Sequence, residues 1–248
     1  MEKNLKCLTL AITIILLSTI VMGVFIGSKM SSFIRSKQLV DAIKAGDRDQ
    51  VEKLLQKGVD PNIPTAPHQG IWKYINTFVE AMPDTPLSIA CKEGDLEIVA
   101  LLLEYNANVN GVDGTKWQPI QAATLNYQEN TLAIVKLLLE NGADTLSNAS
   151  QAPFALAAQM QVPENADGTL NQQAMQEITE TVILLMDDNS NTHHEYNYLL
   201  CYAAQNGNLL LVQHLLENGT DTDIRYAGKT AYDYAVDNGF TDIANLLK

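Results

Sequence analysis

The sequence predicts an all-α repeat solenoid of about six helix-turn-helix units, preceded by one apolar helix at the N-terminus. Three observations lead to this fold class. Similar segments recur with a period near 33 residues, and each contains two short apolar patterns at helical spacing. Aromatic residues make up only 6% of the 248 residues, whereas 46% are hydrophobic. A period of this length is typical of stacked repeats, and the composition argues against a sheet protein.

One segment, TPLSIACKEGDLEIVALLLEYNANVN at residues 85–110, shows the repeated unit clearly. Thr85 followed by Pro86 predicts an N-cap and a first helical position, and this helix is expected to end at Gly94. Asp95 can cap a second helix, whose apolar residues form one broad face. Helices this short are marginal alone and expose more Leu, Ile and Val than they can bury on each other, so the unit must stack on similar units.

The copies occupy most of the chain, from residue 37 to residue 248. Their approximate bounds are 37–62, 85–110, 117–146, 151–192, 198–223 and 228–248, with insertions at 63–84 and 161–173. The third copy aligns if three residues are inserted near Tyr127. The second insertion is polar, and we expect a mobile loop that extends the inner helix of the fourth copy.

The patterns T-P-L-x-x-A and G-D/N-x-x-x-V-x-x-L-L-L-x-x-G-A-D-x-N, as they stand in this chain, resemble those of ankyrin repeats. The resemblance implies that each unit is a hairpin finger followed by two antiparallel helices. It also implies that fingers and inner helices line a concave surface that binds other proteins. The chain departs from the family at copy five, which has Tyr198-Leu199 in place of Thr-Pro, and at copy one, which lacks that dipeptide and resembles an atypical cap.

The N-terminal sequence differs from the repeats and predicts a separate segment. Residues 7–27 carry no charge and follow a basic leader, residues 1–6. As a helix these 21 residues would span about 32 Å, enough for a hydrocarbon core of about 30 Å. We expect an uncleaved transmembrane or signal-anchor helix, followed by a juxtamembrane linker at residues 28–36. A cleaved signal peptide and a buried core helix are the alternatives.

The side of the membrane depends on two conflicting signals. The short basic leader favours a single-pass protein of a bacterial inner membrane with its repeats in the periplasm. The basic residues that follow the apolar segment, Lys29, Arg35, Lys37 and Lys44, favour the cytoplasm instead. We expect the periplasmic arrangement.

Charge is distributed unevenly along the chain. Up to Lys57 there are nine Lys or Arg against five acidic residues, and from Gly58 onward there are seven against 24. No basic residue occurs between Lys136 and Arg225, where twelve Asp or Glu do. Such a surface repels nucleic acid and would attract a basic protein partner, although acidic residues also serve solubility alone.

Residues that could carry chemistry are few, and they predict neither an enzyme nor a cofactor site. His193-His194-Glu195 lacks the spacing of a zinc-binding helix, so a solvated loop is the preferred interpretation. Cys91 and Cys201 lie three repeats apart, too far for a disulfide, and are expected to be buried thiols. We expect no small-molecule substrate and no metal.

The candidate partner-binding residues come from two sources. The insertion at 63–84 is unusually aromatic, which predicts either a recognition finger or a helix that covers the edge between copies one and two. The family resemblance implies contacts at the residue before the Thr-Pro slot and at the pair before the inter-helix glycine. Together with Tyr127, the candidates are Ile71, Trp72, Tyr74, Phe78, Lys92, Glu93, Trp117, Asn197, Gln205 and Asn206.

The function expected from these patterns is a membrane-tethered protein-protein interaction module without catalysis. A scaffold that holds a partner at the membrane is one role. An inhibitor, for example an immunity protein that neutralises an exported toxin, is the other, since both roles need only a shaped surface. An enzyme is the third hypothesis, and the sequence offers it almost no support.

Overall fold

The computed structural model describes residues 34–63, 84–112, 115, 117–145, 152–187 and 198–248. The chain divides into two compact units, Met1–Asp60 and Pro61–Lys248, and each is described by itself. Within the described residues the regular structure is helical, and β-structure is limited to two isolated bridges. The predicted all-α class is therefore confirmed.

The first unit contains a helical stretch over residues 34–44 and helix α2, Arg48–Gln56. Asp47 is the N-cap of α2, because its carboxylate accepts a hydrogen bond from the Gln50 amide at 3.0 Å. This satisfies one of the amide groups that a helix start leaves without an intrahelical partner. The buried side chains of these two helices are mostly apolar and include Leu39, Val40, Ile43, Val51, Leu54 and Leu55.

The second unit is a series of helix pairs, and in each pair the first helix is called inner and the second outer. The inner helices are α4 (Pro86–Glu93), α6 (Pro119–Ala123), α8 (Pro153–Ala158), α10 (Leu199–Gln205) and α12 (Ala231–Asp237). The outer helices are α5 (Leu96–Glu104), α7 (Thr131–Glu140), α9 (Gln172–Asp187), α11 (Leu209–Glu217) and α13 (Thr241–Leu246). These pairs lie within the residue ranges given above for repeats two to six.

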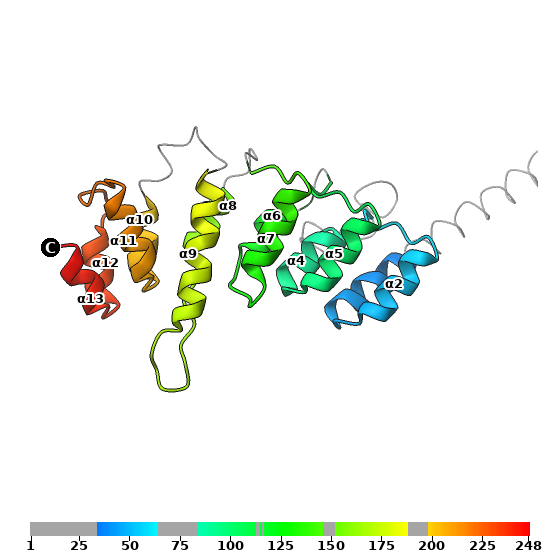
Figure 1. Ribbon diagram of the computed structural model, residues 1–248, viewed down its shortest axis with the longest axis horizontal. Helices are drawn as coiled ribbons and strands as arrows, with labels where there is room; N and C mark the ends of the chain where they lie inside the picture. The colour runs from blue at the N-terminus through cyan, green and yellow to red at the C-terminus, as the bar shows by residue number, and fades with distance from the viewer. Residues whose placement is uncertain (1–33, 64–83, 113–114, 116, 146–151, 188–197) are drawn as a thin grey trace, which may run out of the picture. The chain divides into compact units, whose positions relative to one another are not determined.

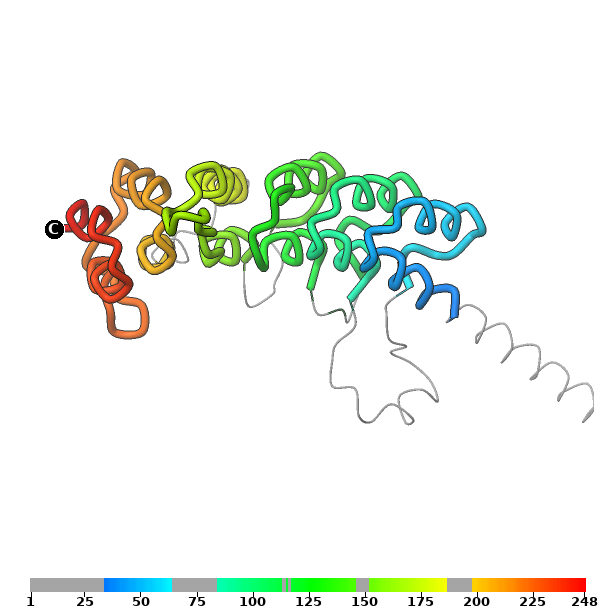
Figure 2. Tube along the Cα trace, turned by 90° about the horizontal axis from the view of Figure 1, so that it is seen from below, coloured from blue at the N-terminus to red at the C-terminus, as the bar shows by residue number. Residues whose placement is uncertain are grey.

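The pairs stack in chain order, as Figure 1 shows from α4 to α13. Each inner helix packs on the inner helix of the next repeat, and each outer helix on the next outer helix. Figure 2 shows the two resulting rows. The core runs between the rows, and its largest fully buried side chains in this unit include Leu87, Ile98, Leu102, Ile120, Leu138 and Phe154. Stability therefore rests on contacts between neighbouring repeats.

The helix boundaries of repeat two follow the local sequence signals. Thr85 caps α4, since its hydroxyl accepts a hydrogen bond from the Ser88 amide at 3.0 Å. Asp95 caps α5 by accepting from the Ile98 amide at 2.9 Å. Between the two helices Gly94 has φ of 77°, a left-handed conformation that glycine adopts without strain. The predicted start of α4 after Thr85 and its predicted end at Gly94 are confirmed.

Asparagine side chains link successive loops of the second unit. The Asn62 side chain accepts from the Asn108 amide at 2.7 Å and donates to the Asn106 carbonyl at 3.1 Å. One repeat further, the Asn110 side chain accepts from the Asp144 amide at 2.7 Å. The asparagine that ends the repeat pattern thus fixes the spacing between neighbouring loops by hydrogen bonds.

Repeat four departs from the expectation for its insertion. The inner helix α8 ends at Ala158, so the added residues do not extend it. They form a turn closed by the bridge between Glu164 and Leu170, followed by an outer helix of 16 residues, whereas α5 has 9. In Figure 1 this turn projects beyond the ends of the neighbouring helices. The extra length belongs to the outer helix because Asn171 caps it early, accepting from the Ala174 amide at 3.0 Å.

Among the described residues, no helix combines the length and apolar character needed to cross a membrane. The predicted anchor at residues 7–27 lies outside the described residues.

Candidate protein-binding surfaces

A cluster of four tyrosines, named here the tyrosine cluster, joins repeats five and six. Its members are Tyr198, Tyr202, Tyr226 and Tyr234, and Tyr226 is central. The ring centre of Tyr226 lies 5.6 Å from that of Tyr198, 4.9 Å from that of Tyr202 and 6.4 Å from that of Tyr234. These are the separations at which aromatic rings attract each other. Tyr198 keeps 42% of its surface exposed, so the cluster presents a ring to solvent.

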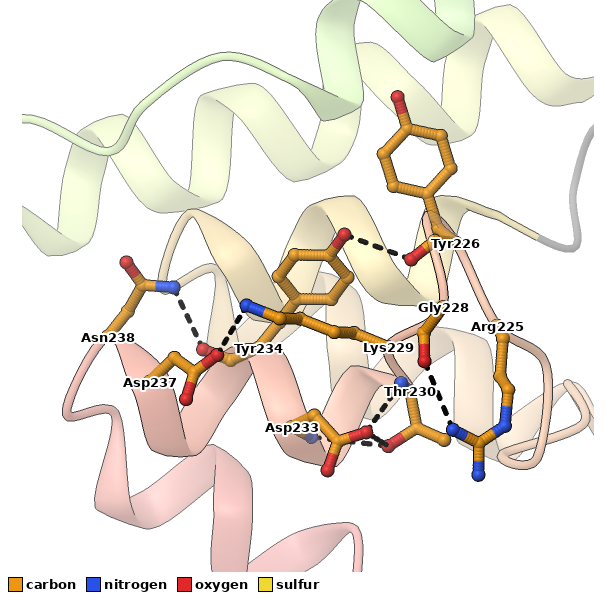
Figure 3. A network of polar contacts seen from close by, with 9 residues as sticks. All are labelled: Arg225, Tyr226, Gly228, Lys229, Thr230, Asp233, Tyr234, Asp237 and Asn238. Atoms are coloured by element: carbon orange, nitrogen blue, oxygen red, sulfur yellow. Dashed lines mark hydrogen bonds and ion pairs between the residues drawn. The ribbon is translucent and has the colours of Figure 1, made fainter.

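The cluster is held by the hairpin finger of repeat six. Tyr226 and Lys229 form a bridge across a two-residue turn, with amide-to-carbonyl hydrogen bonds of 2.9 and 3.0 Å. Both turn residues have positive φ, 48° at Ala227 and 85° at Gly228, as the tightest hairpin turns require. The Tyr234 hydroxyl, from α12, donates to the Tyr226 carbonyl at 3.0 Å (Figure 3). Finger and inner helix are thus fixed to each other.

Charged groups surround the same finger. Lys229 Nζ lies 2.7 Å from an Asp237 carboxylate oxygen and 5.6 Å from the centre of the Tyr234 ring (Figure 3). The hydrogen bond to Asp237 raises the pKa of Lys229, so its ammonium stays charged. Burial raises the pKa of Tyr202 and that of Tyr234, so these phenols are neutral hydrogen-bonding groups at physiological pH.

A groove of about 790 Å³ lies between repeats three and four. It is lined by the loop that follows α6, Leu125–Tyr127, and by the segment that follows α8, Gln159–Glu164. Both segments are places where the repeats carry extra residues. The volume is in the range of small-ligand and side-chain pockets.

One hydrogen bond connects the two repeats beside this groove. The Tyr127 hydroxyl donates to Glu177 Oε2 at 2.8 Å, and the other oxygen of that carboxylate accepts from the Gln173 amide group at 3.0 Å. Burial and then the Glu177 carboxylate raise the pKa of Tyr127, and Glu129 adds to the shift. The phenol therefore remains protonated and can keep donating to Glu177.

The described candidate residues do not meet in one pocket. Lys92 and Glu93 are exposed at the end of α4, and Gln205 is exposed at the end of α10, three repeats away. Asn206 has a structural contact, since its amide group donates to the Ala158 carbonyl at 3.4 Å. Trp117 is half-buried, and its carbonyl accepts from the Ser88 hydroxyl at 3.0 Å.

Five of the candidates, Ile71, Trp72, Tyr74, Phe78 and Asn197, lie outside the described residues, as does His193-His194-Glu195. In the described part of the chain no group of three or more His, Cys, Asp or Glu side chains is placed to hold a metal ion. Cys91 and Cys201 are buried free thiols, as expected, and burial raises the pKa of each. Both thiols are therefore protonated at neutral pH and shielded from solvent.

The tyrosine cluster was not among the candidates from the sequence. A compositional signal was present, because six of the nine tyrosines fall between residues 196 and 234. Tyr198 had been noted only as a departure from the Thr-Pro pattern. Tyr127 is a candidate from the sequence and residues 161–173 are a predicted loop, but the sequence predicts no groove between them.

Comparison of the sequence with known proteins identifies its family. A family model for ankyrin repeats in three copies matches residues 39–149 and 170–248. An ankyrin repeat protein of Rickettsia bellii is 31% identical over 124 residues, which is 46% of this chain and 51% of the relative. The ankyrin repeat protein nuc-2 of Neurospora crassa is 32% identical over 146 residues, 56% of this chain and 12% of the relative.

A third relative is the ARF GTPase-activating protein Git of Drosophila melanogaster. It is 30% identical over 98 residues, which is 40% of this chain and 11% of the relative. The chain therefore aligns with about half the length of the Rickettsia protein and with about a tenth of the other two.

Proposed function

Since the chain belongs to the ankyrin-repeat family, we propose that it is a non-catalytic module that binds a protein partner on its fingers and inner helices. The observation that carries the proposal is the tyrosine cluster. Tyrosine is enriched at the energetic centres of protein interfaces, where its ring supplies contact area and its hydroxyl supplies a hydrogen bond. Tyr198 offers such a ring at the exposed edge of a cluster that is already fixed in place.

A site-specific crosslinking experiment tests this surface. A photoreactive phenylalanine is placed at Tyr198 of the full chain in its native cells, and at Gln213, an exposed position on the outer helix α11, as the control. We expect a crosslinked protein from the first position and none from the second. Tyr198→Ala should then weaken binding of the captured partner by about 2 kcal/mol, the scale of an interface hot spot. Equal capture at both positions, or unchanged affinity, would reject the surface.

The proposal includes a membrane tether through residues 7–27, with the repeats in the periplasm of a bacterium. Support comes from the length of the uncharged segment and from the basic leader before it. In cells with a permeabilised outer membrane, added protease should digest the repeats, while a cytoplasmic marker protein stays intact. Full protection of the repeats would contradict the periplasmic location.

The aromatic insertion at 63–84 is proposed to extend the binding surface. Replacing Trp72 by Ala should then weaken partner binding by at least about 2 kcal/mol and leave the melting temperature nearly unchanged. Leu102→Ala, which opens a cavity at a fully buried position of α5, is the control for simple destabilisation. A lowered melting temperature with unchanged affinity would show that Trp72 covers the fold instead.

An inhibitor role is the second candidate, favoured by the acidic balance from Gly58 onward. An immunity protein of this kind would occlude the basic site of an exported toxin. A toxin gene beside this gene, and loss of toxicity when both are expressed together, would support that role over a scaffold.

A further inference from the structure

We propose that the groove between repeats three and four accepts an arginine side chain from a basic segment of the protein partner. The inference rests on the proposed binding function and names the chemistry of one contact. The site is distinct from the tyrosine cluster, because loops at the carboxyl ends of inner helices α6 and α8 form it, while finger and inner-helix residues of repeats five and six form the cluster.

The lining of the groove suits the stem of a long side chain. Leu125 and Pro163 supply partly exposed apolar surface, and the lining residues Met160 and Val162 are almost completely buried. Arginine and lysine both cover apolar surface with their methylene groups while the charged end stays in a polar environment. A groove of about 790 Å³ has room for one such side chain and its neighbours along a peptide.

The charge around the groove selects a cation. Glu164 lines it, and Glu177 and Glu129 both act on the hydroxyl of Tyr127, another lining residue. No lysine or arginine is among the residues that line it. The lining segment Gln159–Glu164 lies in the part of the sequence between Lys136 and Arg225, which contains no basic residue. A groove whose lining contains a carboxylate and no lysine or arginine is complementary to a basic partner.

Arginine fits the groove better than lysine for two reasons. Its guanidinium is planar, so it can stack on an aromatic ring, and it can donate two hydrogen bonds to one carboxylate. Tyr127 and Glu164, both among the residues that line the groove, are the proposed partners for the stacking and for the hydrogen bonds. The Tyr127 hydroxyl also donates to Glu177 at 2.8 Å, so the position of this side chain is fixed before any partner binds.

The test is a titration of the full chain, kept in nonionic detergent, with fluorescent eight-residue peptides read by anisotropy. One peptide carries two arginines, a second carries lysines at those positions, and a third carries citrulline, which has the shape of arginine without its charge. We expect the arginine peptide to bind at least tenfold more tightly than the citrulline peptide and more tightly than the lysine peptide.

Two matched variants locate the binding. Glu164→Gln should lower the affinity for the arginine peptide about fivefold, the scale of one partly exposed ion pair. Glu140→Gln removes the same charge from an exposed position on α7 outside the groove and should have no such effect. An equal loss of affinity in both variants would show that only the overall negative charge of the protein attracts the peptide, and it would overturn the proposal. Equal binding of the arginine and citrulline peptides would also overturn it. Equal binding of arginine and lysine would overturn the preference for guanidinium.

The Tyr198→Ala variant separates this inference from the proposed function. It should leave peptide binding to the groove unchanged, because the tyrosine cluster is not part of the groove lining. If the groove fails every test while crosslinking at position 198 succeeds, only the arginine site is lost. If crosslinking fails while the groove binds arginine, the proposed surface on repeats five and six is lost instead.

Discussion

Single residues decide how closely neighbouring repeats approach each other, and glycine at the inter-helix turn is the clearest case. Gly207 has φ of 73°, and a Cβ atom added there would lie 2.7 Å from ring carbons of Phe240. Phe240 belongs to the next repeat, where it is the N-cap residue of α13. Glycine is therefore required twice at this position, by its backbone conformation and by the packing of the next repeat.

Gly207→Ala should lower the free energy of unfolding by about 2 to 4 kcal/mol, measured by urea denaturation. About 1 to 2 kcal/mol is the expected cost of a left-handed alanine, and the remainder is the cost of displacing the Phe240 ring. Gly219→Ala is the matched control, since Gly219 has φ of 77° and no atom within 4 Å of its added Cβ. Equal losses in the two variants would mean that the ring moves without cost.

Ala227, at the tip of the repeat-six finger, has φ of 48°, a left-handed conformation that is unfavourable for alanine. Ala227→Asn should raise the melting temperature, because asparagine tolerates this conformation and relieves a strain of about 1 kcal/mol. The adjacent change Gly228→Ala, at φ of 85°, should lower it by a similar amount. No gain at position 227 would show that the turn relaxes by other means.

At the scale of the element, capping determines where helices begin, and α12 has the most complete cap in the described residues. The Thr230 amide and hydroxyl both donate to Asp233 Oδ2 at 2.9 Å, and the Asp233 amide donates to the Thr230 hydroxyl at 3.2 Å. Figure 3 shows this reciprocal pair beside Tyr234. The cap thus begins the helix that carries one member of the tyrosine cluster.

The cap makes the stability of repeat six dependent on pH. The hydrogen bonds from Thr230 lower the pKa of Asp233 below its ordinary value. A carboxyl with a lowered folded-state pKa stabilises the fold fully above its unfolded pKa of about 3.9, and this contribution is lost as pH falls through the folded value. Asp233→Asn should therefore lower the melting temperature at pH 7 and have little effect near pH 2.

Asp242→Asn is the control for this prediction, because Asp242 is exposed in the first turn of α13 and takes no part in a capping box. Both substitutions remove a negative charge near a helix start, so the interaction with the helix dipole is matched. A pH-independent difference between wild type and Asp233→Asn would contradict the role of the ionised cap.

At the scale of the whole molecule, the main feature is the separation of charge along the chain. The segment from Gly58 onward carries 24 acidic against seven basic residues. Long-range attraction raises the association rate of an oppositely charged partner, and it weakens as salt shortens the Debye length. The same charge also keeps a repeat protein soluble.

If the partner is basic, its association rate constant should fall steeply as salt rises beyond about 0.15 M, where the Debye length is about 8 Å. Stopped-flow mixing at several salt concentrations measures this, and the dissociation rate constant serves as the internal control because steering affects it little. An association rate that does not change with salt would assign the charge to solubility alone.

The sequence by itself determined the all-α class, the presence of ankyrin repeats and the helix boundaries of repeat two. Those features depend on signals within a few residues, such as Thr85 before Pro86, Asp95 after Gly94 and apolar residues at helical spacing. The same repetition identified the family, because a unit that cannot bury its own apolar face must stack on copies of itself.

Only the tertiary structure decided which side chains meet. Tyr198, Tyr202, Tyr226 and Tyr234 come from a helix start, two inner helices and a finger, and stacking of repeats five and six brings their rings together. The groove likewise joins two loops more than 30 residues apart, and the length of α9 depends on a cap at Asn171 that the repeat pattern does not contain. Local signals act within a helical turn, whereas a binding surface is set by the packing between turns of the solenoid.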